Sequence, residues 1–226
     1  MKVLIKSLSI MILLFATTSY GKQEQTILNG SVYLEGTVDK ALILAHGQGK
    51  HPKWKVVNPL RKSINDSLGY HTLSLQMPNN REKWKKYADD FPKAYQTIED
   101  AISFLKEKGV KEIYLLGHSM GARMSSSFLS EIGSPDIKGF VIIGCRNNGG
   151  DPFSCVNNVD NIQDIPILDI WGAKNKRDRK SAQSREYLLS DNYKQVSING
   201  ANHKLDGHDD ELKKVVIDWL KSIQNK

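Results

Sequence analysis

The motif Gly117-His118-Ser119-Met120-Gly121 constrains the fold of this chain more than any other segment. It has the form Gly-x-Ser-x-Gly, in which a serine sits on a sharp turn between a strand and a helix, with its Oγ clear of its neighbours. Small residues two before and two after the serine allow the two backbones to approach closely. The flanks fit, because Lys111–Leu116 has the pattern of a buried strand and Ala122–Ile132 that of a helix. We therefore predict that Ser119 is held at a strand–helix turn.

Strand-like and helix-like segments alternate along the rest of the chain. The predicted strands are Ile27–Glu35 (a strand or hairpin), Ala41–Ala45, Tyr70–Gln76, Gly139–Gly144, Ile165–Trp171 and Tyr193–Ile198. The predicted helices are Asn58–Leu68, Phe91–Lys108 and a closing helix with Leu212, Val215, Val216, Trp219 and Leu220 on one face. Strands that are apolar throughout and separated by helices indicate an α/β fold, a mainly parallel sheet with helices on both faces. Ligands of such sheets bind at the carboxyl ends of the strands, where the polar clusters of this chain fall.

The N-terminus has the layout of a secretory signal. Lys2 and Lys6 precede the apolar stretch Leu8–Ala16, and Ser19-Tyr20-Gly21 supplies small residues for cleavage. We predict that residues 1–21 are a signal peptide and that residues 22–226 form one α/β domain, in the periplasm or secreted. An uncleaved membrane anchor is the alternative, although the apolar core is short for a bilayer.

Charge and cysteine usage narrow the expected partners. The net charge is +7, but lysines and arginines are interleaved with acids, which favours a solvated surface over contact with an anionic envelope. No nucleic-acid-binding module is recognisable, so we expect no nucleic-acid partner. In an oxidising compartment Cys145 and Cys155 are expected to form a disulfide, with two free thiols as the alternative.

The order of these parts resembles that of the α/β-hydrolase superfamily across nearly the whole mature chain. A His46-Gly47 turn follows an early strand, and the serine turn, an acid region and a late histidine come after it. The chain looks most like small esterases, lipases and dienelactone hydrolases without a large cap domain. The resemblance implies a Ser…acid…His triad with a backbone oxyanion hole. We expect no cofactor.

Ser119 is the expected nucleophile, and a serine hydroxyl needs a base within hydrogen-bond reach. Of the six histidines, His203 is preferred, because it lies between the last strand and the last helix, where the superfamily places its base. His208 is the runner-up, although it could instead flank the start of that helix. His46 and His118 are expected to shape the strand-end turns.

A metal site is a minor alternative for the late histidines. His203, Asp206 and His208 have suitable side chains, but nothing in their spacing requires a metal. We predict no metal site.

The superfamily pattern also implies two backbone N–H donors for the oxyanion. One comes from the residue after the nucleophile, here Met120, and the second from the turn after the early strand, here Gln48. Gly47 and Gly49 allow unusual torsions in that turn.

The acid departs from the superfamily pattern. Counting from Gly172 at the end of a strand, the usual aspartate position holds Asn175, which cannot ionise. Asp178 is our first choice for the acid, and Asp151, in the loop that a disulfide would rigidify, is the second. An orienting role for the Asn175 amide is third. Asp169 lies inside a strand and is expected to point elsewhere.

These residues predict an exported serine hydrolase that cleaves a small-molecule or lipid-like carboxylic ester, a thioester or a lactone. The alternative is a non-catalytic binding protein on a hydrolase scaffold, because Asn175 occupies the usual acid position. Acyl transfer to an envelope component would use the same residues. The segment Asn79–Asp90, with Trp84 and Tyr87, is either a rim over the site or a solvated linker.

Overall fold

The computed structural model describes residues 23–27, 29–79, 83–162 and 165–224. The predicted signal peptide, residues 1–21, lies outside this part of the chain. The strands are β1 (Glu24–Ile27), β2 (Ser31–Leu34), β3 (Lys40–Ala45), β4 (His71–Leu75), β5 (Glu112–His118), β6 (Ile137–Ile143), β7 (Ile167–Gly172) and β8 (Tyr193–Ile198). The α-helices are α1 (Val57–Leu68), α2 (Phe91–Glu107), α3 (Met120–Glu131), α4 (Cys155–Asp160), α5 (Lys176–Gln183) and α6 (Asp209–Ile223). Two short 3₁₀-helices are η1 (Trp84–Asp90) and η2 (Glu186–Leu188).

The strands form one eight-stranded sheet in the order β1-β2-β4-β3-β5-β6-β7-β8. Strands β3 to β8 run parallel, whereas β1 and β2 form an antiparallel hairpin whose second strand pairs with β4. The mainly parallel sheet is therefore as predicted. Because the six parallel strands point the same way, their carboxyl ends meet at one edge of the sheet.

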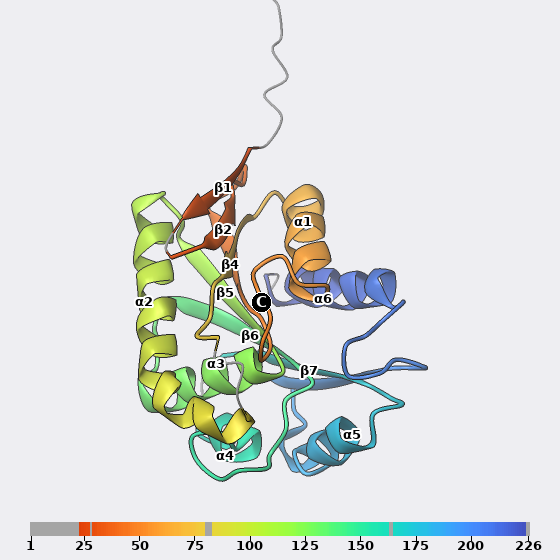
Figure 1. Cartoon of the computed structure of the whole chain (residues 1–226). Coiled ribbons are helices and arrows are strands. Elements are labelled where there is room, and N and C mark those ends of the chain that lie inside the picture. Colours follow the sequence, from red (N-terminus) through yellow and green to blue (C-terminus); the bar gives the residue numbers. More distant parts are fainter. Residues whose placement is uncertain (1–22, 28, 80–82, 163–164, 225–226) are drawn as a thin grey trace, which may run out of the picture.

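Helices cover both faces of the sheet (Figure 1). On one face α2 and α3 bury side chains such as Ile98 and Phe128 against Ile43 and Leu115. On the other face α1 and α6 pack against the opposite side of the same strands. Every strand residue from Ala41 to Ala45 is fully buried, which explains the apolar runs in the sequence. Each leucine or isoleucine among them contributes on the order of 1.5–3 kcal/mol through burial.

Each strand and helix predicted from the sequence occurs close to its expected residues. The short helices η1, α4 and α5 were not predicted, and they lie in the connections after β4, β6 and β7. Within the described residues these connections hold only η1 and α2 after β4, α4 after β6, and α5 and η2 after β7, so the fold has no large cap domain. None of the helices in the described ranges is long and apolar enough to cross a membrane.

Candidate active site

Ser119 sits at the predicted sharp turn between β5 and α3. Its backbone has φ 56° and ψ −112°, a strained conformation for a residue other than glycine, and its N–H donates to the Ile143 carbonyl at 2.9 Å. A Cβ at Gly117 would overlap the Ala122 backbone, and one at Gly121 would overlap the carbonyl of Ala45. The two glycines therefore let α3 start directly against the ends of β5 and β3, as the motif requires.

The structure brings His203 next to Ser119, although 84 residues separate them in the sequence. The Ser119 hydroxyl lies 2.9 Å from His203 Nε2, and His203 Nδ1 lies 2.6 Å from Asp178 Oδ2. With its proton on Nδ1, the imidazole donates to Asp178 and leaves Nε2 to accept from Ser119. This arrangement is the one that activates a serine hydroxyl.

Asp178 is the acid in this arrangement, and it lies on the first turn of α5 with a 1% exposed side chain. Arg146 Nε donates to its second carboxylate oxygen at 2.7 Å. Burial by itself would raise the pKa of Asp178, but hydrogen bonds and charges from His203 and Arg146 outweigh it and hold the pKa below its ordinary value. The carboxylate is therefore ionised at neutral pH.

The other carboxyl and amide candidates make different contacts. Asn175 is the N-cap of α5, and its Oδ1 accepts from the N–H groups of Arg177 and Asp178. Asp151 is exposed and accepts a hydrogen bond from Asn157. Asp169 is fully buried and pairs with Arg185.

His46 and His118 are buried, and each directly precedes one of the two turns of the site, at Gly47–Gln48 and at Ser119. His46 Nδ1 donates to the Gly47 carbonyl at 2.9 Å, and its Nε2 accepts from the Met77 N–H at 3.1 Å. His118 Nε2 lies 3.0 Å from the His203 carbonyl oxygen, to which it donates. Burial lowers the pKa of His46 to about 4, and burial followed by the charge of His203 lowers that of His118 to about 4. Both rings are therefore neutral braces for the strand-end loops.

The possible metal ligands do not gather. Asp206 pairs with Lys55 at 2.7 Å, and His208 Nδ1 lies 3.5 Å from Glu211 at the start of α6. Among the described residues no group of three histidine, cysteine or acidic side chains could hold a metal ion.

The predicted oxyanion donors belong to two backbone segments that contact Ser119. A Cβ at Gly47 would lie 3.2 Å from Ser119 Cβ, so the Gly47–Gln48 turn packs directly against the serine. Met120 is the first residue of α3, where helix N–H groups lack partners within the helix. Gln48, Met120 and Ser119 line the same cavity. A helix N-terminus and a packed backbone turn at this place suit a developing negative charge.

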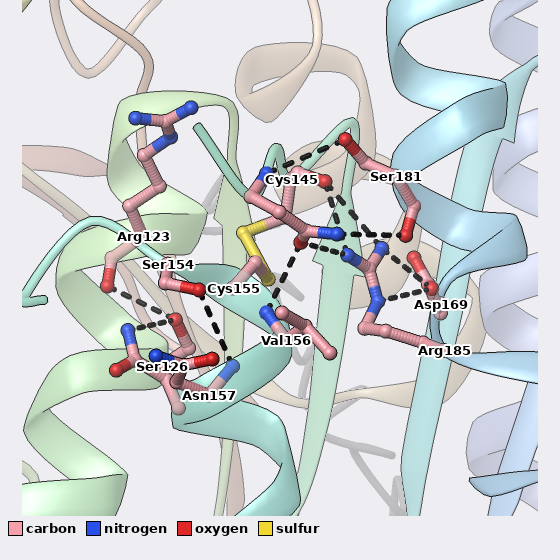
Figure 2. Close-up of a disulfide and its surroundings, with 12 residues drawn as sticks. Arg123, Ser126, Cys145, Ser154, Cys155, Val156, Asn157, Asp169, Ser181 and Arg185 are labelled. Carbon is pink, nitrogen blue, oxygen red and sulfur yellow. Dashed lines mark hydrogen bonds and ion pairs between the residues drawn. A yellow bond between two sulfur atoms is a disulfide. The ribbon is translucent and has the colours of Figure 1, made fainter. Parts of the chain in front are cut away.

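The cysteines pair as predicted. Cys145, just after β6, and Cys155, at the start of α4, form a disulfide with their Cα atoms 6.0 Å apart. Figure 2 shows the buried Arg185 between Cys145 and Asp169, where its guanidinium donates to the Cys145 carbonyl and to the Asp169 carboxylate. The disulfide and this ion pair fix the loop that begins with Arg146.

Gly144, Arg146 and Arg123 of the site were not identified from the sequence. Gly144, with φ +60°, lies under the imidazole, and a Cβ there would be 3.1 Å from His203 Nδ1. Arg146 and Arg123 line a cavity of about 630 Å³ beside Ser119.

Trp84 of η1 lines the same cavity, and the Tyr87 hydroxyl accepts from the Gly49 N–H at 3.3 Å. These contacts favour the rim over the linker for the described part of the segment Asn79–Asp90, of which residues 80–82 lie outside the described residues.

Comparison with known proteins supplies the family. Residues 80–222 match the family model described as "Protein of unknown function (DUF3530)". The chain belongs to this family. No curated protein matches it. The match spans η1, the serine turn, Asp178 and His203, but not the Gly47–Gln48 turn.

Several solved structures share this fold at low sequence identity. Est1E from Butyrivibrio proteoclasticus is 17% identical with a TM-score of 0.69, over 91% of this chain and 100% of that one. Dienelactone hydrolase from Anabaena variabilis is 15% identical with a TM-score of 0.71, over 89% and 98%. XC6422 from Xanthomonas campestris, described as an a/b serine hydrolase without lid, is 12% identical with a TM-score of 0.65, over 89% and 94%. This DUF3530 member therefore has the α/β-hydrolase fold.

Proposed function

We propose that this protein is a serine hydrolase that cleaves a carboxylic ester through an acyl-enzyme on Ser119. The observation that carries the proposal is the unbroken chain of hydrogen bonds from Ser119 Oγ through His203 to Asp178, at 2.9 and 2.6 Å. A buried carboxylate that orients a histidine, which in turn accepts the proton of a serine, is the arrangement used for acyl transfer on several unrelated folds.

In the first step Ser119 Oγ attacks the carbonyl carbon while His203 Nε2 accepts its proton. Asp178 stabilises the imidazolium, and the N–H groups of Gln48 and Met120 hold the oxyanion. The tetrahedral intermediate then collapses, the carbon–oxygen bond to the alcohol breaks, and His203 returns the proton to the departing oxygen. Water, activated by His203, releases the acid and regenerates Ser119.

The structural relatives support an ester as the substrate class. Est1E is an esterase by its name, and its structure has also been determined with ferulic acid bound. Thioesters and lactones present the same carbonyl to the serine, so they belong to the same proposal. Fold alone does not choose among them.

The alternative of a non-catalytic binding protein was founded on Asn175. The helix cap made by Asn175 gives that residue another role, and Asp178 supplies a carboxylate to His203. Asn175 therefore no longer favours a binding protein over a hydrolase.

Labelling with a fluorophosphonate probe tests the proposal. We expect the purified protein to be labelled and to hydrolyse short p-nitrophenyl esters, and we expect Ser119→Ala and His203→Gln to lose both properties. His208→Gln is the matched control, because that histidine lies near Glu211 instead. A folded wild-type protein that is neither labelled nor active favours the binding protein. Product formed on added alcohol acceptors, in place of free acid, favours acyl transfer.

We further propose that the protein is exported. The support is the secretory layout of residues 1–21 together with a disulfide, which is typical of oxidising compartments. Fractionation of the native host, followed by N-terminal sequencing of the mature protein, tests this. A cytoplasmic protein that retains Met1 would contradict it.

A further inference from the structure

The cavity beside Ser119 is unusually rich in positive charge. Its lining of described residues contains Arg123, Arg146, Arg177 and Lys180 but no aspartate or glutamate. Asparagine and serine side chains supply much of the remaining lining, and Trp84 is its large aromatic residue. A pocket for a neutral acyl chain is expected to contain only a few polar groups. The positive charges therefore favour a negatively charged ligand.

Arg123 is the most informative of these cations, because it is only 6% exposed and no carboxylate of the described residues pairs with it. Its guanidinium donates to the Asn148 carbonyl at 3.1 Å and to the Asn148 side-chain oxygen at 2.6 Å. Its charge lies 5.3 Å from the Trp84 ring centroid and 5.8 Å from that of Phe153. Burial, and then the charge of Arg146, lower the pKa of Arg123 to about 10, so it is still protonated at neutral pH. Its hydrogen-bond partners are neutral, and the more distant Asp178 carboxylate supplies the favourable charge. An anionic ligand in direct contact would compensate the buried cation further.

Arg146 extends this charge toward the serine. Its Nε donates to Asp178, whereas its two terminal nitrogens make no hydrogen bond within the described residues. It therefore links the catalytic carboxylate to the cavity wall. Planar guanidinium groups bind the paired oxygens of carboxylates and phosphates well.

The exposed cations come from one face of α5. The cavity-lining residues Arg177, Lys180, Ser181 and Ser184 follow the spacing of a helical face, whereas Arg179 lies off it. Because Arg177 and Lys180 are exposed, their field reaches an approaching anion from solvent and is screened by salt.

A second cavity, of about 370 Å³, indicates where the alcohol part and the acyl part of an ester would bind. It is lined by His203, Trp54 and the cations Lys50, Arg146 and Lys204, and His203 does not line the first cavity. The buried cation Arg123 lines the first cavity and not the second. The alcohol must leave beside His203, which protonates it, so the alcohol belongs in the second cavity. The acyl part then extends along α3 past Met120 toward Arg123.

We propose that the acyl part of the substrate carries an oxyanion, a carboxylate or a phosphate, that binds between Arg123 and Arg146. The substrate class is thus an ester of a dicarboxylic or phosphono-carboxylic acid with one anionic end. This inference rests on the proposed function and narrows its substrate.

Three matched substrates test it. The 4-nitrophenyl esters of adipic acid, 5-phosphonopentanoic acid and hexanoic acid share a four-methylene chain and end in a carboxylate, a phosphonate and a methyl group. We expect kcat/KM for at least one anionic ester to exceed that for the hexanoate tenfold or more at low salt, after subtraction of spontaneous hydrolysis. The ratio should fall in 0.5 M NaCl. Whichever anion is preferred identifies the terminal group.

Variants connect the preference to the cavity. Arg123→Gln should lower the anionic-to-neutral ratio of kcat/KM tenfold or more. Because a buried arginine can be needed for folding, the exposed double variant Arg177→Gln/Lys180→Gln provides a second route and should lower the ratio several-fold. Arg179→Gln, on the other side of the same helix, is the matched control and should keep the wild-type ratio.

The inference is wrong if the wild type hydrolyses the hexanoate with a kcat/KM equal to or above that of both anionic esters. It is also wrong if the ratio is unchanged in both Arg123→Gln and Arg177→Gln/Lys180→Gln. Neither result contradicts the proposed serine hydrolase activity. If no ester reacts and Ser119 is not labelled, the proposed function fails instead. Calorimetric titration with adipate then tests the anion site independently of ester hydrolysis. Binding that is lost in the double variant but kept in Arg179→Gln supports the site, and absence of binding to the wild type rejects it.

Discussion

Asp178 Oδ2 lies 2.6 Å from His203 Nδ1, although Asp178 stands three residues beyond the position where the superfamily usually carries its acid. The offset follows from α5. Asn175 caps this helix, and Asp178 in the first helical turn contacts His203. Gly144, where a Cβ would lie 3.4 Å from Asp178 Oδ2, leaves room for the carboxylate. An unconventional sequence position therefore gives a conventional pair.

Replacing Asp178 by asparagine should remove this pairing with little change in shape. Because an amide cannot stabilise the imidazolium and favours the wrong tautomer, we expect kcat to fall roughly 10³–10⁴-fold. Asp151→Asn is the matched control, since the exposed Asp151 contacts Asn157 and not His203. Ester hydrolysis and circular dichroism of both variants check this. A loss below tenfold for Asp178→Asn, with the fold retained, would reject it as the acid.

The sequence predicts most of the fold because the parallel strands are buried on both faces. Segments such as Ala41–Ala45 are apolar throughout, so their pattern is unambiguous. The serine turn is equally predictable, because Gly117 and Gly121 are required where backbones touch. These signals are local, and each depends on a few consecutive residues.

Two other parts of the site, helix α5 and Arg123, could not be predicted from the hydrophobic pattern of the sequence. Helix α5 is almost entirely polar and buries only Asp178 and Ala182, so it has no apolar stripe to predict it. An asparagine three residues before an aspartate is nevertheless typical of a helix start, and this signal could have favoured Asp178 over Asn175. Arg123 is a single cation in a helix whose residues from Met120 to Leu129 are all buried. The sequence does not show that this charge is buried or which cavity it lines, because both depend on the tertiary structure.

The Gly47 turn should be sensitive to a single methyl group. In Gly47→Ala the new Cβ would lie 3.1 Å from His118 Nδ1 and 3.2 Å from Ser119 Cβ, which displaces the turn that carries the Gln48 N–H. We expect kcat to fall about tenfold, less than the 10²–10³-fold of a fully lost oxyanion donor. Gly49→Ala, where a Cβ meets no atom within 4 Å, should cost some stability through its positive φ but much less activity. Equal kcat losses in the two variants would contradict this role of the turn.

Removing the disulfide should destabilise the protein more than it slows catalysis. The bridge closes a short loop between residues ten apart, so Cys145→Ala/Cys155→Ala should lower the free energy of unfolding by about 2–3 kcal/mol. The Arg185 hydrogen bonds to Cys145 and Asp169 still hold the loop, so kcat should fall less than tenfold. Urea unfolding and ester hydrolysis measure the two effects. Two free thiols in the non-reduced wild-type protein, detected by mass spectrometry, would refute the premise.

The buried histidines should make stability depend on pH in the mildly acidic range. Each of His46 and His118 has a pKa of about 4 in the folded protein, below the ordinary value of 6.5. Between these values the unfolded chain binds protons that the folded chain does not, so stability is full above about pH 6.5 and declines as pH falls toward 4. The loss is on the order of 3 kcal/mol for each histidine.

His118→Gln keeps a donor for the His203 carbonyl but removes this titration. Its unfolding free energy should therefore change less between pH 7 and pH 4.5 than that of the wild type, even if its stability at pH 7 is lower. His51→Gln, at an exposed histidine, is the control and should follow the wild-type curve. Urea denaturation at a series of pH values gives the three slopes. Parallel curves for His118→Gln and the wild type would mean that the ring beneath the serine turn does not resist protonation, and the assignment of His118 as a neutral brace would fail.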